Sequence, residues 1–494
     1  MYYPNEKEFL KISKKSNVIP VFKKISADLD TPVSAYLKIR KDRYSFLLES
    51  VEGKEKIARY SFIGSNPSLV FLSKKRNIEI HYPQKNTYKR FITKSSPLDE
   101  MRNIMKDFKA AHTKGLPRFF GGLVGYMGYD MARFFEELPD KNPDALDLPD
   151  SIFLLTDTVL IFDHFNHTIN IVSNCLIPKN SGSKSSKTKI YRQALKKIEE
   201  LHCQLKNPVP LSKTDALPKK PLKIIKSNLT MSQFENIVRQ AKEYIKKGDI
   251  IQTVLSQRFN TEINREPFDI YRNLRRMNPS PYMYFLELKL LTLIGTSPEM
   301  LVRYEDHIAQ TRPIAGTRPR SNSEEADKKL EKDLLKDKKE KAEHIMLVDL
   351  GRNDLGKVCL PGKVSLSEFM TIERFSHVMH IVSEVTGIVN KKYDCYDVLK
   401  SCFPAGTVSG SPKIRAMEII DELENLRRGP YAGCVGYFSF SHNMDTCITI
   451  RTIIIKNRIA YIQAGAGIVA DSVPAKEYTE TVNKAKALFE AIKG

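Results

Sequence analysis

Two stretches in the first half of the chain have the hydrophobic pattern of β-strands. They run from Ile57 to Ile80 and from Ser151 to Ser173, and the second contains the nearly continuous apolar segment FLLTDTVLIF. Short β-branched and aromatic runs between turn residues predict strands. Neither half shows the steady strand–helix alternation of a doubly wound parallel sheet.

Polar and helical patterns separate these strands from the rest of the chain. The segment Pro178 to Lys189 has the composition of a solvated loop, and a charged helix is expected from Tyr191 to Lys206. A basic, proline-containing segment follows it. We therefore expect the main domain boundary near residue 225, with regions 1–225 and 226–494.

The second region begins with a helix-start signal. Thr230 and Gln233 form a capping box, and apolar residues recur at helical spacing until Gly248. The strand IIQTVLSQRF follows. Because nearly all the unusual local patterns lie beyond this point, we expect the second region to be catalytic.

Composition narrows the class of protein. The 494 residues are 41% hydrophobic and 28% charged, which is ordinary for a globular chain. No run approaches the ~18 apolar residues of a membrane span, and the polar start is no secretory signal, so the cytoplasm is the expected location. Seven cysteines without a CxxC pair are expected to be reduced packing residues.

The net charge of +21 raises the question of a nucleic-acid partner. The lysines are spread over the whole chain, however, and no nucleic-acid motif accompanies them. A general lysine-rich surface is therefore favoured over a phosphate-binding face.

Two pairs of glutamates recur at a spacing of three residues. Glu340 and Glu343 share one face of a predicted helix, and Glu477 and Glu480 share a face of another. Two facing pairs would form an oxygen-only ligand set of the kind that Mg²⁺ prefers. The alternative is a solvated charged helix face.

Two runs of small residues indicate an anion site. In PAGTVSGSPK, Ser411 can be the N-cap of a helix with Pro412 at its first position, and Lys413 would attract a carboxylate or phosphate. The run QAGAGI follows a predicted strand and allows backbone amides to approach a ligand. Each run is also explained by a tight turn, but together with Arg451 they favour the anion site.

Two further segments offer chemistry. Gly316, in PIAGTRPR, can place a threonine hydroxyl and backbone amides near a carboxylate. Glu299, after GTSP, could be a buried general acid. A β-turn with a cap is the alternative explanation for each segment.

Taken in order, these segments resemble the chorismate-binding enzymes, and among them anthranilate synthase component I. The resemblance covers Thr230 to Gly494 closely, and the first half more sparsely through LLES, RYSFIG and GGLVGYMGY. It implies an α+β fold in which antiparallel sheets form a sandwich surrounded by helices. The matching segments are GDIIQTVLSQRF, GTSPE, PIAGTRPR, AEHIMLVDLGRNDLGKV, FSHVMH, FPAGTVSGSPK, RRGPYAG, RTIIIK and QAGAGIVADSVPAKEYTET.

The resemblance also implies the binding residues. Glu343 and Glu480 would hold Mg²⁺, with Glu340 and Glu477 beside them, and the metal would neutralise the ring carboxylate of chorismate. The residues implied for the substrate are Gly316, Thr317, Tyr431, Arg451, Gly465, Ala466 and Gly467, with Thr407 and Lys413 nearby.

Two positions indicate which reaction of the family follows. Relatives that add water to chorismate carry a lysine base where this chain has Gln252, which points to amination. Aminodeoxychorismate synthase carries a lysine nucleophile where this chain has Ala315, so ammonia should attack directly. By resemblance, Glu299 protonates the departing hydroxyl and His380 transfers a proton as pyruvate is eliminated; His377 is the neighbouring alternative.

Regulation and partners are implied in the same way. Ser50 with Pro281, Tyr282 and Met283 matches the family's pocket for tryptophan as an inhibitor, although a strand end and a proline-rich turn would explain the same residues. The chain carries no glutamine amidotransferase motif. Ammonia is therefore expected from a separate amidotransferase subunit, anthranilate synthase component II, in a heterotetramer, or from solution.

Two other functions remain as alternatives. Aminodeoxychorismate synthase component I requires another residue to replace the lysine that is missing at Ala315. A non-catalytic basic binding protein would retain nucleic acid in a salt-sensitive way and would be indifferent to Glu343→Gln.

Overall fold

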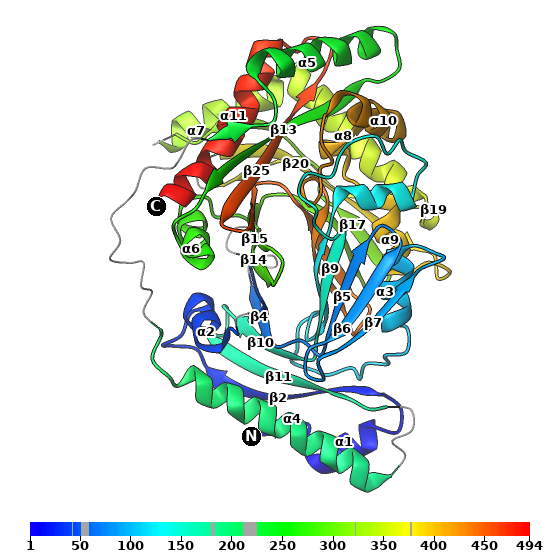
Figure 1. Cartoon of the computed structure of the whole chain (residues 1–494), viewed down its shortest axis with the longest axis vertical. Coiled ribbons are helices and arrows are strands. Elements are labelled where there is room, and N and C mark those ends of the chain that lie inside the picture. Colours follow the sequence, from blue (N-terminus) through cyan, green and yellow to red (C-terminus); the bar gives the residue numbers. More distant parts are fainter. Residues whose placement is uncertain (42, 51–58, 179–182, 211–224, 322, 376–377) are drawn as a thin grey trace.

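Two large antiparallel sheets lie at the centre of the molecule, with helices around them (Figure 1). This computed structural model describes residues 1–41, 43–50, 59–178, 183–210, 225–321, 323–375 and 378–494. The arrangement confirms the expected α+β fold.

The first sheet has 13 strands within the described residues, in the order β1-β2-β11-β10-β4-β3-β14-β15-β24-β25-β13-β12, and β21 pairs with β13 beside this path. Its strands are β1 (Tyr2–Tyr3), β2 (Val18–Ser26), β3 (Tyr44–Glu49), β4 (Tyr60–Ser65), β10 (Thr158–Asp163), β11 (Thr168–Leu176), β12 (Lys226–Ser227), β13 (Gln252–Glu262), β14 (Tyr282–Leu288), β15 (Thr292–Ser297), β21 (Gly410–Ser411), β24 (Thr452–Lys456) and β25 (Ile459–Ile468).

The second sheet has 12 strands in the described part of the chain, in the order β18-β20-β17-β16-β23-β22-β8-β9-β5-β6-β7, and β19 pairs with β20. Its strands are β5 (Leu69–Lys74), β6 (Asn77–Tyr82), β7 (Thr87–Ile92), β8 (Gly122–Met127), β9 (Ser151–Thr156), β16 (Met300–Glu305), β17 (Ile308–Thr311), β18 (Ile314–Pro319), β19 (Cys359–Arg374), β20 (Val378–Val389), β22 (Cys434–Ser439) and β23 (Met444–Ile448).

Helices cover the outer sides of these sheets (Figure 1). They are α1 (Glu6–Ile12), α2 (Pro32–Ile39), α3 (Pro97–Met105), α4 (Lys184–Leu205), α5 (Met231–Lys246), α6 (Pro267–Met277), α7 (Glu324–Lys336), α8 (Lys338–Gly356), α9 (Cys395–Cys402), α10 (Lys413–Leu423) and α11 (Pro474–Lys493), with short 3₁₀ turns η1 (Tyr129–Phe134) and η2 (Gly406–Val408).

The apolar run FLLTDTVLIF forms the end of β9 and nearly all of β10. Side chains of β10 alternate between two hydrophobic cores: Val159 and Ile161 enter one, and Leu160 and Phe162 enter the other. Because both faces of this strand are buried, the sequence shows a continuous apolar run instead of an alternation. The predicted strands in 151–173 are confirmed, as are β4, β5 and β6 over the described part of 57–80.

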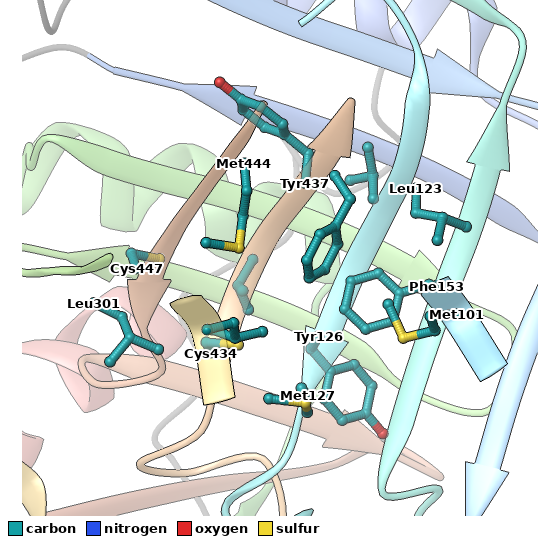
Figure 2. Packing of buried hydrophobic residues seen from close by; sticks show 14 of the residues in the cluster. Met101, Leu123, Tyr126, Met127, Phe153, Leu301, Cys434, Tyr437, Met444 and Cys447 are labelled. Atoms are coloured by element: carbon teal, nitrogen blue, oxygen red, sulfur yellow. The ribbon is translucent and has the colours of Figure 1, made fainter. Parts of the chain in front are cut away.

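The larger core lies between the two sheets, and Figure 2 shows part of it. Phe46 and Tyr284 reach it from the first sheet, and Phe153 and Tyr437 from the second. A second core packs the opposite face of the first sheet against α1, α2, α4, α6 and α11. Helix α11, which carries Glu477 and Glu480, is therefore held against the first sheet.

Both sheets combine strands from the two predicted regions. Strand β3 pairs with β14, and β8 pairs with β22. The boundary near residue 225 stays a prediction, and residues 211–224 of the expected linker lie outside the described residues.

Three local predictions need correction. Helix α4 begins at Lys184, inside the expected loop, because the side chain of Ser183 caps it by accepting from the amide of Ser186. Ser411 pairs with Gln252 as part of β21, so the N-cap of α10 is Pro412. The QAGAGI run lies within β25 itself, where it pairs with β13.

Other local predictions are confirmed. The Thr230–Gln233 capping box starts α5, and the helix ends before Gly248, which has φ +85°. All seven cysteines are free thiols, and six of them are buried. Across the described residues, no helix combines the length and apolar character needed to cross a membrane.

The crowding at Gly125 gives a stability prediction. A Cβ on this residue of β8 would collide with the carbonyl oxygen of Ile152 on β9. We expect Gly125→Ala to lower the free energy of unfolding by about 1–3 kcal/mol, the usual effect of overpacking. Gly356, at the end of α8, has no atom within 4 Å of where a Cβ would lie, so Gly356→Ala should be neutral or stabilising. Urea denaturation of both variants would test this, and equal effects would contradict it.

Candidate active site

Glu299 lies between β15 and β16, on the wall of a cavity that Thr407 and Asp354 also line. Its side chain is buried, and burial raises the pKa of Glu299 to about 8, against the opposing effects of the Thr407 hydroxyl and the Lys484 ammonium. The carboxyl is therefore mostly protonated at neutral pH. A protonated carboxyl in a cavity is a candidate proton donor, as predicted for this residue.

His380 belongs to β20 and faces the bulge in β18. Its Nδ1 lies 2.8 Å from the carbonyl oxygen of Gly316 and 3.1 Å from Oγ1 of Thr317. Since a carbonyl only accepts, Nδ1 carries the hydrogen, and Nε2 is left as an acceptor. Burial and the nearby Arg451 lower the pKa of His380, which keeps the ring neutral. His377 lies outside the described residues.

The bulge at Gly316 requires glycine. Its φ is +67°, and a Cβ there would lie 3.2 Å from Oε2 of Glu340. The bulged part of β18 that carries Thr317 therefore approaches Glu340 of α8 closely. Three of the predicted site residues, Gly316, Thr317 and His380, are brought together here.

The small residues of β25 make room for other side chains of the site. A Cβ on Gly465 would lie 2.7 Å from the Tyr431 hydroxyl, and one on Gly467 would lie 2.7 Å from Nε2 of Gln252. Gln252 is buried, and its Oε1 has no hydrogen-bond partner. Ala466 points the other way, into the core under α5 and α10, so only its backbone can face a ligand.

Arg451 opens onto a surface cleft along α11. The cleft is lined by Arg451, Ala475, Lys476, Thr479, Glu480, Asn483 and Lys484. Burial lowers the pKa of Arg451, against the effects of Glu480 and Tyr431. A desolvated guanidinium beside an open cleft is suited to a carboxylate ligand.

The four predicted metal ligands lie on α8 and α11. Burial raises the pKa of Glu343, and repulsion from Glu340 and Glu480 raises it further. Burial also raises the pKa of Glu340 and that of Glu477, with a contribution from Glu480. Carboxylates that repel one another fit the donor set of a divalent cation. Among the described residues, however, no three His, Cys, Asp or Glu side chains form a ready ligand group.

Lys484 is a functional candidate that the sequence patterns do not single out. Its Nζ lies 2.6 Å from Oε1 of Glu480 and donates to the carbonyl oxygen of Gly465 at 2.9 Å. It therefore provides a positive charge between the glutamates and the β25 strand. The signal for it is its i+4 spacing from Glu480, which puts both side chains on one helix face.

Lys413 is less available than expected. Its Nζ forms an ion pair of 2.6 Å with Asp354, and it also donates to the carbonyl oxygen of Cys402 at 3.3 Å. Asp354 lines the Glu299 cavity, whereas Lys413 does not line it. Its charge is already balanced by that partner.

A second cavity, which Glu299 does not line, lies between the sheets. Ser50, Pro281, Tyr282 and Met283, the four residues predicted to form one pocket, all line it. The hydroxyl of Tyr282 donates to Asp445 at 2.9 Å, whereas the buried Ser50 Oγ has no hydrogen-bond partner. The remaining lining residues are Leu48, Glu49, Tyr60, Phe62, Arg118, Tyr284, Arg303, Val435, Gly436, Tyr437, Asp445 and Cys447.

Comparison with known proteins covers the whole chain. A family model described as "chorismate binding enzyme" matches residues 44–490. An anthranilate synthase component 1 from Aquifex aeolicus is 50% identical, over 98% of this chain and 97% of the relative. One from Acetivibrio thermocellus is 48% identical, over 100% and 99% of the respective lengths.

Solved structures agree with this assignment. Anthranilate synthase component I from Streptococcus pneumoniae matches with a TM-score of 0.76 and 37% identity, covering 94% of this chain and 99% of that one. The isochorismate synthase MenF from Escherichia coli, at 18% identity and a TM-score of 0.70, shares the fold. The chain belongs to the chorismate-binding enzymes and, within them, to the lyases known as anthranilate synthase component 1.

Proposed function

We propose that the chain converts chorismate and ammonia to anthranilate and pyruvate, as the Mg²⁺-dependent large subunit of a feedback-regulated anthranilate synthase. The observation that carries this proposal is the buried Glu299 on a cavity wall, where burial raises its pKa to about 8. An amination that expels a hydroxyl group needs such a proton donor, and the site also needs groups that hold two carboxylates. Arg451, Gly316 and Thr317 offer those groups.

The nucleophile needs no strong base in this site. Ammonia is already nucleophilic, and the uncharged Gln252 stands where a water-activating base would be required. Ala315 carries no group that could form a covalent adduct with chorismate, and it is buried in β18. Both positions support direct attack by ammonia over hydration or over the aminodeoxychorismate reaction.

Proton transfers follow from the two titrating groups. Glu299 gives its proton to the departing 4-hydroxyl, whose loss accompanies amination at the carbon next to the ring carboxylate. His380 presents a neutral Nε2 that can take a proton during the elimination of pyruvate. The second step leaves the aromatic amine.

The carboxylates of α8 and α11 would hold the metal, with Glu343 and Glu480 as ligands and Glu340 and Glu477 beside them. Bound there, Mg²⁺ would supply positive charge to neutralise the ring carboxylate of the substrate. The repulsion among these glutamates supports this assignment, because a cation would relieve it.

The name component 1 of the relatives implies a second component. We propose that a glutamine amidotransferase subunit docks on this chain in a heterotetramer and delivers ammonia internally. The cavity around Ser50 would bind tryptophan as the inhibitor. The Ser50 hydroxyl, which has no hydrogen-bond partner, would contact the tryptophan.

The reaction and its control can be tested together. Purified chain with chorismate, Mg²⁺ and ammonium should form fluorescent anthranilate, and tryptophan should suppress this. Ser50→Phe fills the cavity, so it should keep the activity and lose the inhibition, whereas Ser185→Phe on the exposed side of α4 should keep both. Formation of 4-amino-4-deoxychorismate in place of anthranilate would refute the proposed reaction, and inhibition retained in Ser50→Phe would refute the pocket.

Glu299 should set an alkaline limb in the pH profile. Because the pKa of Glu299 is raised to about 8, its proton is fully present below about pH 7 and is lost as the pH rises through 8. With free ammonia held constant, kcat/KM should fall over this range. Glu299→Gln should lower kcat by about 10²- to 10⁴-fold. A flat profile between pH 7 and 9 (roughly one pKa unit to either side) would contradict the assignment of Glu299.

Glu343 should determine the affinity for the metal. Glu343→Gln should raise the Mg²⁺ concentration for half-maximal activity at least about tenfold, since even an outer partner of a metal ligand is worth that much. Glu325→Gln, an exposed change on α7, should leave it unchanged. Titration calorimetry with Mg²⁺ in the presence of chorismate would check both variants, and unaltered binding by Glu343→Gln would remove this residue from the metal site.

A further inference from the structure

Arg428 is the largest fully buried side chain of the described residues, with 1% of its surface exposed. It lies just beyond α10, in the segment RRGPY. Its Nε and Nη2 donate to the two carboxylate oxygens of Glu424, at 3.0 and 2.6 Å. This two-point ion pair fixes the plane of the guanidinium.

The remaining donors of Arg428 reach two backbone segments that carry site residues. Nη1 donates to the carbonyl oxygen of Val408 at 2.7 Å, next to Thr407 in η2. Nη2 donates to the carbonyl oxygen of Val254 at 2.6 Å, two residues after Gln252 in β13. One guanidinium therefore joins two elements that line the site and are far apart in the sequence.

The face of the same guanidinium is covered by aromatic rings. Its central carbon lies 5.6 Å from the ring centre of Tyr431 and 4.7 Å from that of Tyr129. This cation–π interaction attracts each ring to the guanidinium and restricts the positions that the ring can take. The Tyr431 hydroxyl at the other end of this ring is the group beside Gly465.

Glu424 is itself anchored to the strands. Its Oε1 accepts from the amide and the hydroxyl of Ser256, each at 2.8 Å. Ser256 pairs with Gly465 across β13 and β25, and its hydroxyl also accepts from Gln463 at 2.8 Å. Hydrogen bonds therefore anchor the ion pair to β13, which carries Gln252, and β13 pairs with β25, which carries Gly465 and Gly467.

Stability alone does not explain this arrangement. A buried ion pair is often no more stabilising than apolar residues of the same volume, because both charges lose their hydration. Apolar residues, however, cannot form hydrogen bonds that fix the orientation of neighbouring segments. Each guanidinium nitrogen of Arg428 has an acceptor, and two of these acceptors, the carbonyl oxygens of Val408 and Val254, belong to segments that carry site residues.

We propose that Arg428, held by Glu424, is a positioning residue for anthranilate formation. It sets Tyr431, Thr407 and the Gln252 end of β13 relative to one another, without contacting the substrate. The inference rests on the proposed function of this site. Its prediction is that Arg428 acts on the reaction through Tyr431.

A double-mutant cycle tests this prediction. Arg428→Lys keeps the charge but loses the planar set of donors, and Tyr431→Phe removes only the hydroxyl. Each single change should raise KM for chorismate more than it lowers kcat, and Arg428→Lys should lower kcat/KM by about 100-fold, as expected for a small misplacement. If Arg428 acts through Tyr431, the double variant should lose less than the product of the two single losses, by more than about twofold.

A matched control separates positioning from folding. Arg59, just before β4, forms a two-point pair with Asp163 at the end of β10, at 3.2 and 2.9 Å; its side chain is 39% exposed, and neither residue lines the Glu299 cavity or the Arg451 cleft. Arg59→Lys should leave KM unchanged, and its effect should be additive with Tyr431→Phe. If Arg428→Lys does not fold, Glu424→Gln replaces it in the same cycle.

The outcomes distinguish two kinds of failure. If Tyr431→Phe leaves KM unchanged, the proposed substrate site is wrong. If Tyr431→Phe raises KM but its effect is additive with that of Arg428→Lys within about twofold, the site stands and the positioning role is overturned. The same holds for additivity with Glu424→Gln.

Discussion

The pairing of β3 with β14 is the contact on which the rest of the structure depends. It joins the two halves of the first sheet at its centre, where strands from before and after residue 225 meet, and it places Glu49 opposite Met283 at one wall of the Ser50 cavity. Strand β14 also pairs with β15, which ends two residues before Glu299. One continuous hydrogen-bonded ladder therefore supports both the cavity proposed for the inhibitor and the proposed proton donor.

The sequence predicts those parts of this arrangement that are local. Capping at Thr230, helical spacing along α5 and the apolar run of β10 arise from neighbouring residues, so they can be read from the chain. The start of α4 was not predictable from composition, because a polar segment becomes helical when Ser183 caps it and its apolar face packs on the sheet. The sequence predicts that QAGAGI follows a strand, but the run lies inside β25, where its glycines leave room for Tyr431 and Gln252.

The site was predictable mainly through its resemblance to a family, since its parts are distant in sequence. Spacing within a helix indicates that Glu477 and Glu480 share a face, but not that α8 lies near them. The i+4 spacing of Lys484 from Glu480 is a local signal for that ion pair, but nothing local reveals that Lys413 is balanced by Asp354. The electrostatic character of the site comes from burial and from such partners, and both are properties of the folded chain.

Each sheet contains strands from both predicted regions, and this constrains how the chain can be divided. Strand β3 covers one edge of β14, and β8 covers one edge of β22. A fragment that began at residue 226 would retain nearly every proposed catalytic group, yet it would expose two long, apolar strand edges to solvent. Open edges of this kind recruit other chains. Strands β3 and β8 therefore shield from aggregation the strands that support the proposed catalytic groups, whatever the first part of the chain contributes to regulation.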